Sequence, residues 1–195
     1  MTTPEGKRMF RQILGAGVTG GVIAFILSAM QNAVLPAGAP RAMPEQPAIL
    51  AALRTIPRAG FYFFPGRGLS RSMTAEQQAE AQTDYRRLFR EGPVGVVAYS
   101  PGGNEFHFGR QLAVQFALSL IAALIAATIL AMMVTTTTYV GRVGIMCLLG
   151  VFAFGYLEPQ YWNWYEFPTS YTISRVFGGV ATWTISGSVM AAIVR

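Results

Sequence analysis

His107 is the only histidine of the chain, and by residue type it is the best candidate for a cofactor-binding residue. It follows Glu105 by two positions in a segment that we predict to be a strand, so the two side chains would share one face. An imidazole there could ligate a metal, a haem or a chlorin. A lone histidine is more typical of an interfacial residue that makes ordinary hydrogen bonds. The sequence therefore identifies no cofactor.

Four charged residues lie beside apolar segments and form a second candidate site, an interfacial ion-pair group. They are Arg110, Glu158, Glu166 and Arg175. A charge close to hydrocarbon costs a few kcal/mol unless it pairs or reaches water. We therefore expect at least one Arg–Glu contact, which would serve either as a structural clamp or as an anion or substrate contact.

Arginines also cluster on one predicted helix, Thr74 to Glu91. Arg86, Arg87 and Arg90 lie near its end, and acidic residues lie nearer its start, as the helix dipole favours. The pattern is typical of a solvated helix face. A docking patch for an acidic partner is the alternative.

The other reactive residues do not define an enzyme. Cys147 is the only cysteine, which excludes an intrachain disulfide and a metal site built from cysteines. No phosphate loop, dinucleotide fingerprint, zinc-protease motif or calcium-binding loop occurs. We predict no catalytic residue, no metal ligand and no enzymatic activity.

The composition indicates a membrane protein. Hydrophobic residues make up 52% of the 195 residues, and charged residues only 12%. The net charge of +6 is spread over several segments without a lysine-rich run, so we expect lipid and protein partners and no nucleic acid.

Four apolar segments predict four transmembrane helices. The clearest is 111–134, which has no charge, Gly or Pro and exceeds the about 20 residues that a membrane helix needs. Segment 13–35 follows basic residues, but it is longer than a signal-peptide core of about 7–15 residues, which favours a retained helix. Segment 171–195 is another span. Segment 143–157 gives only about 22 Å of helix and spans with help from its neighbours or a thinner membrane.

Small residues recur at helical spacing in the first and last of these segments. Such residues let helix backbones approach closely, which favours association in lipid. The candidate packing residues are Gly17, Gly21, Ala24 and Ser28 in the first segment, and Gly179, Gly187 and Ala191 in the last. Glycine is also simply common in membrane helices, which is the alternative interpretation.

Residues 36–110 form a polar insertion that we predict to be a small α+β unit. Helices are expected at 46–56 and at 74–91, where Thr74 and Gln77 match a capping box. Strands are expected at 60–64, 94–99 and 104–108, the last two joined by a turn at 100–103.

An aromatic interfacial loop is expected at 158–170. Indole and phenol rings favour the headgroup layer of a membrane. The interfacial aromatic residues are Tyr161, Trp162, Trp164 and Tyr165.

The distribution of basic residues predicts the orientation. Residues 1–12 and the short loop 135–142 carry more basic than acidic residues, which places both on the cytoplasmic side. Both termini would then be cytoplasmic, and the insertion would be extracytoplasmic. The expected fold class is a mainly α membrane protein with four transmembrane helices and an α+β extracytoplasmic insertion, in the inner membrane of a bacterium.

No charge lies deep in any predicted span, so neither an ion path nor a proton relay is evident. The leading hypothesis is a non-catalytic accessory subunit that packs against other proteins or pigments of a larger membrane complex. An energy-transducing complex is one candidate. The alternative is a small transporter, channel or lipid-handling protein with an outer vestibule lined by the ion-pair group.

Overall fold

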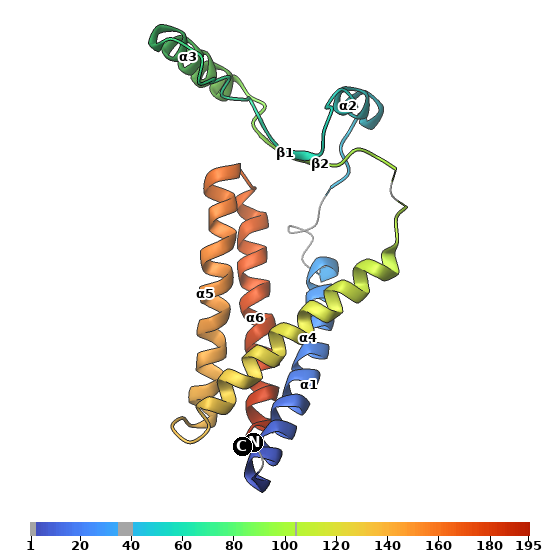
Figure 1. Ribbon diagram of the computed structural model, residues 1–195, viewed down its shortest axis with the longest axis vertical. Helices are drawn as coiled ribbons and strands as arrows, with labels where there is room; N and C mark the ends of the chain where they lie inside the picture. The colour runs from blue at the N-terminus through green and yellow to red at the C-terminus, as the bar shows by residue number, and fades with distance from the viewer. Residues whose placement is uncertain (1–2, 35–40, 104) are drawn as a thin grey trace. The chain divides into compact units, whose positions relative to one another are not determined.

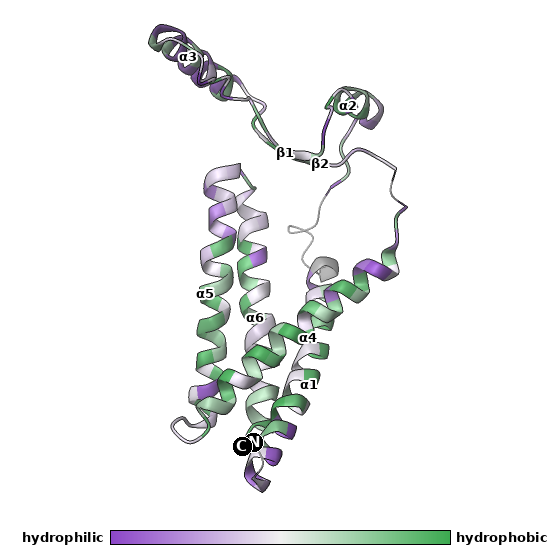
Figure 2. Ribbon diagram, in the orientation of Figure 1, coloured by the Kyte–Doolittle hydropathy of each residue, from purple (hydrophilic) through white to green (hydrophobic). Residues whose placement is uncertain are grey.

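The computed structural model describes residues 3–34, 41–103 and 105–195, and it is mainly helical (Figure 1). Four of its helices are long and apolar enough to cross a membrane. They are α1 (Pro4–Val34), α4 (Phe108–Met132), α5 (Tyr139–Tyr165) and α6 (Thr169–Ile193). Figure 2 shows hydrophobic residues along most of their length. At this level, the predicted fold of four apolar helices with a small sheet is confirmed.

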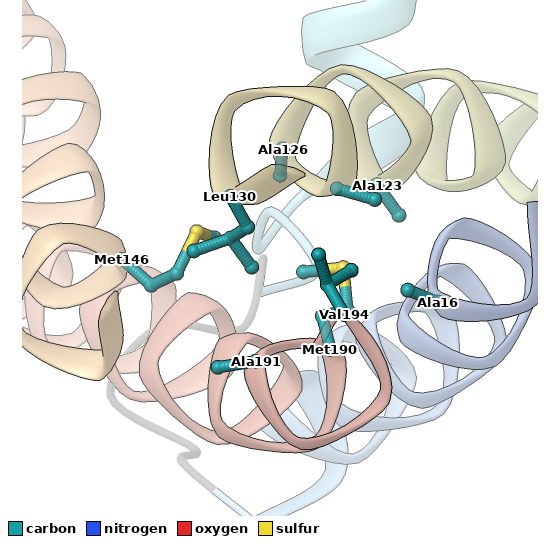
Figure 3. Close-up of a cluster of buried hydrophobic side chains, with 9 residues drawn as sticks. Ala16, Ala123, Ala126, Leu130, Met146, Met190, Ala191 and Val194 are labelled. Carbon is teal, nitrogen blue, oxygen red and sulfur yellow. The ribbon is translucent and has the colours of Figure 1, made fainter. Parts of the chain in front are cut away.

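The chain divides into two compact units, which we describe separately. The first unit holds α1, α4, α6 and α5 up to Gln160. Its core is a cluster of buried side chains that come from all four helices (Figure 3). In this cluster Met146 of α5 lies beside Leu130 of α4. Met190 of α6 and Val194, which follows α6, lie toward Ala16 of α1. Five of the nine residues of this cluster are alanines, whose small side chains let the helix backbones approach closely.

Glycines of α1 provide the closest helix contacts. A Cβ built on Gly21 would lie 2.9 Å from the Cα of Leu120, and one on Gly17 would lie 3.1 Å from the Cα of Leu124. Because the nearest atoms include α4 backbone, a side chain at either glycine would force the helices apart. Ala24 is buried on the same face, and Ser28 is half-buried.

Helix α5 is longer than we predicted at both ends. It begins at Tyr139 and continues through Pro159 to Tyr165, so it has 27 residues, or about 40 Å of helix. The expected loop at 135–142 is therefore helical from Tyr139, and the expected loop at 158–170 is helical up to Tyr165. Pro159 lies inside this helix, although a proline has no amide hydrogen to donate within a helix.

The second unit comprises Arg41–Glu105 together with Tyr161–Phe167. It contains α2 (Gln46–Leu53), β1 (Gly60–Phe64), α3 (Ala75–Glu91) and β2 (Gly95–Tyr99). The two strands pair antiparallel, with Gly60 opposite Tyr99 and Phe64 opposite Gly95.

The predicted strand at 104–108 is wrong for the residues that the structure describes. Asn104 lies outside them, residues 105–107 have no regular structure, and Phe108 begins α4. The pairing partner of β2 is β1, which places Phe61 and Phe63 opposite Ala98 and Val96. These cross-strand contacts favour β1 as the partner over the adjacent sequence.

The capping box of α3 is confirmed. The Thr74 hydroxyl accepts a hydrogen bond from the Gln77 amide at 3.3 Å, and the Gln77 side chain accepts one from the Thr74 amide at 3.0 Å. Gly92 follows the helix with a φ of 65°, which only glycine adopts readily. Local signals therefore determine both ends of α3.

Candidate functional site

Glu158 and Arg175 are brought together by the antiparallel arrangement of α5 and α6. The short connection between these helices makes residues near their adjoining ends face one another. Arg175 Nε donates to Glu158 Oε1 at 3.4 Å. The Glu158 side chain is only 8% exposed and that of Arg175 is 32% exposed, so the pair is largely desolvated. A buried carboxylate without this partner would be strongly destabilising.

The other two members of the interfacial ion-pair group do not join this contact. Arg110 lies exposed near the start of α4. Glu166 is exposed, has a φ of 55° and belongs to the second unit. Neither residue makes an ion pair within the described parts of the chain.

A cavity of about 580 Å³ lies beside Arg175 and is lined by all four long helices. Aromatic and aliphatic side chains form much of its wall, among them Phe25, Phe154 and Trp183. Its polar lining residues are Ser28, Gln31, Gln115, Ser119, Arg175 and Thr182. A mostly apolar hollow with a few convergent polar groups is typical of a small-molecule binding site.

The cavity extends to the middle of two helices. Ser119 and Ala122 lie near the midpoint of α4, and Thr182 and Trp183 lie near the midpoint of α6. Beyond this depth the buried cluster around Ala16, Leu130 and Val194 fills the space between the helices. The cavity therefore has a closed inner end.

Only some of the polar groups in the cavity have protein partners. Gln31 Nε2 donates to the Ser174 carbonyl at 3.1 Å, and the Ser119 hydroxyl donates to the Gln115 carbonyl at 3.0 Å. Arg175 uses only Nε, so both of its terminal nitrogens lack an acceptor among the described residues. Thr182 is 5% exposed and also lines the cavity. Arg175 thus retains donors for a ligand.

The predicted packing residues of α6 are all buried. A Cβ on Gly179 would collide with the Phe154 ring, and one on Gly187 would collide with the Met146 side chain. Ala191 is fully buried in the core cluster. These residues bring α5 close to α6.

Arg142 is a buried residue whose role the sequence did not reveal, because we placed it in a loop. It lies in the first turn of α5, where Nη1 donates to the Thr137 carbonyl at 3.1 Å and Nη2 donates to the Ala191 carbonyl at 3.0 Å. The second contact places a cation on a carbonyl near the end of α6, as the helix dipole favours. Met146 and Gly150 follow at intervals of four and are also buried, and this periodicity was a usable signal.

The interfacial aromatic residues lie in α5 and not in a loop. The Tyr165 ring contacts those of Phe61 and Phe63, with centroid distances of 5.2 and 5.4 Å. Tyr161 contacts Tyr165 at 5.7 Å, whereas Trp162 and Trp164 are exposed. Phe61, Phe63, Tyr161 and Tyr165 therefore form a ring cluster within the second unit.

The strand that we predicted around His107 is not present, and the assignment of His107 as a cofactor-binding residue stays a prediction. The residue is exposed and precedes α4, so it does not share a strand face with Glu105. No group of three or more potential ligands occurs among the described residues.

The arginines of α3 are only partly available to a partner. Arg87 pairs with Asp84 and, at 2.8 Å, with Glu91, and these hydrogen bonds raise the pKa of Arg87 above its ordinary value. Arg86 and Arg90 remain as exposed charges, with Arg90 Nε donating to the Arg86 carbonyl at 3.3 Å. The possible docking patch is therefore smaller than the sequence indicated.

Comparison of the chain with protein-family models, with curated proteins and with solved structures found no match.

Proposed function

We propose that the chain is an integral membrane protein that acts as a non-catalytic subunit and docks another protein through its second unit. The observation that carries this proposal is that no described residue of the second unit is buried. The unit nevertheless forms two helices and a sheet, and it exposes Phe61, Phe63 and Leu69.

Energetics favour a covered surface. Ordering a backbone costs about 1–2 kcal/mol per residue, which small domains offset mainly by burying apolar side chains. A two-stranded sheet without a core is marginal in water. A protein partner that covers the ring cluster would supply the missing burial, at about 25 cal/mol per Å² of apolar surface.

The four apolar helices support placement in a membrane. In this proposal both termini face the cytoplasm and the second unit faces outward, because the short basic segments satisfy the positive-inside rule in that orientation. The basic residues concerned are Lys7, Arg8 and Arg11 near the start of α1, and Arg142 in the first turn of α5.

The test is to purify the full chain from its native membrane in mild detergent and to measure the mass of the assembly. We expect a complex larger than the 21.1 kDa chain. The double substitution Phe61→Glu and Phe63→Glu should release the partner while the chain still resists carbonate extraction. The matched control is Ser70→Glu with Ser72→Glu, two exposed polar positions of the same unit. A monodisperse monomer in both wild-type and variant protein would refute the subunit proposal.

The cavity favours a second candidate function, the binding or handling of a lipid or another small molecule. The depth of the cavity and the unused N–H donors of Arg175 suit a ligand. The packed cluster that closes its inner end argues against a continuous channel. Among the sequence-based alternatives, ligand binding is therefore favoured over conduction.

A further inference from the structure

We infer that the cavity between α1, α4, α5 and α6 binds one amphipathic lipid whose phosphate or carboxylate head is held by Arg175. This inference rests on the proposed membrane insertion and specifies the ligand class of the second candidate function. It does not require a protein partner.

Most of the hydrogen-bond donors of Arg175 have no acceptor among the described residues. A guanidinium has five N–H donors, and Arg175 uses one of them on Glu158. Donors without acceptors are costly where water is scarce, and the side chain is only 32% exposed. Since Glu158 occupies the Nε side, the two terminal nitrogens remain for a ligand. Two parallel N–H groups suit the paired oxygens of a phosphate or carboxylate.

The wall of the cavity combines apolar side chains with a cation. Phe25, Leu112, Phe154 and Trp183 line it together with Arg175. A free inorganic anion would gain nothing from these side chains, and a pure hydrocarbon would leave the Arg175 donors unsatisfied. An amphipathic molecule satisfies both parts of the lining. The volume of about 580 Å³ is also within the usual range for small-molecule sites.

The residues of α6 that line the cavity lie at different depths along the helix. Arg175 lies in the second turn of the helix and Thr182 near its midpoint, about 10 Å further along the axis. In a membrane, this arrangement places the cation nearer the interface and the apolar wall toward the bilayer centre. A bilayer lipid has the same order, with its charged head at the interface and its apolar chain toward the bilayer centre.

The experiment is a binding measurement by native mass spectrometry on the full chain, released from nanodiscs. The probes are phosphatidylglycerol, oleate, phosphatidylcholine and inorganic phosphate. We expect selective retention of the two anionic lipids over phosphatidylcholine. Arg175→Gln should weaken their retention about tenfold or more, because hydrogen bonds to charged groups contribute about 1.5–3 kcal/mol.

Two further variants separate the cavity from general charge effects. Arg110→Gln removes an exposed arginine that does not line the cavity, and it should leave retention unchanged. Ala122→Phe should fill the inner part of the cavity and reduce retention of both lipids.

Three results would overturn the inference. Equal loss in Arg175→Gln and Arg110→Gln would indicate a nonspecific charge effect. Competition by inorganic phosphate would indicate a simple anion site, and equal retention of all lipids would indicate annular lipid. Carbonate extraction tests the proposed membrane insertion separately. A chain that washes off refutes membrane insertion. A chain that stays in the membrane but binds no lipid selectively refutes only the lipid site.

Discussion

The two units of the chain achieve order in different ways. In the first unit, Ala16, Ala123 and Leu130 are fully buried at helix contacts. In the second unit, no described residue reaches that burial, and order depends on a capping box, a strand pair and aromatic ring contacts. The long helices are therefore stabilised by contacts with one another, whereas the second unit lacks a core that could stabilise it alone.

The largest loss of stability should come from combining Gly17→Ala with Gly21→Ala in the first unit. The added methyl groups meet Leu124 and Leu120, including α4 backbone, so the helices must separate. We expect a loss of about 3 kcal/mol of unfolding free energy, the upper part of the range for overpacking. The measurement is reversible unfolding of the purified chain in bicelles.

Gly144→Ala is the matched control for these glycines. It is also helical, but a Cβ there meets no atom within 4 Å. Alanine should be neutral or stabilise the helix by up to about 1 kcal/mol. Equal destabilisation by the control and the double variant would show that the α1–α4 contact is not specifically close-packed. The first unit would then not owe its stability to close helix packing.

A smaller loss is expected from Arg142→Ala. This change removes two charge-assisted hydrogen bonds, to the carbonyls of Thr137 and Ala191. Because it also removes a buried charge whose Nε is unpaired, we expect a net cost of about 2 kcal/mol in the same unfolding measurement. Arg195→Ala serves as the control, since its Nε contacts the Ala192 carbonyl at an exposed site. If both variants lose the same stability, Arg142 has no special role in the first unit.

The sequence predicted best what local interactions determine. The aromatic run of β1 matches Gly60–Phe64, and the Thr74–Gln77 capping box begins α3. The four long apolar segments also correspond to helices, because hydrophobicity and length are local properties.

Contacts between distant segments could not be predicted in the same way. The partner of β2 is β1, on the far side of α3 in the sequence, so a neighbouring segment was wrongly chosen. The cavity requires the packing of four helices, and no periodicity reveals it. Gln31 and Gln115 were the available signal, as polar residues beside or within apolar runs, but their meeting at one cavity depends on tertiary structure.

The smallest effect should come from Thr74→Ala in the second unit. It removes the hydroxyl that accepts from the Gln77 amide, which costs about 1 kcal/mol and should speed amide exchange throughout 75–91 by about fivefold. Thr83→Ala is the control, because it removes only a bond to the Ala79 carbonyl within the helix and should not speed exchange. The purified chain without a partner should show the full difference, since no core supports α3. If amide exchange in the purified variant stays slow and unchanged, α3 is stabilised by more than its capping interactions. The second unit would then not need a partner protein to cover it, and this difference from the first unit would not hold.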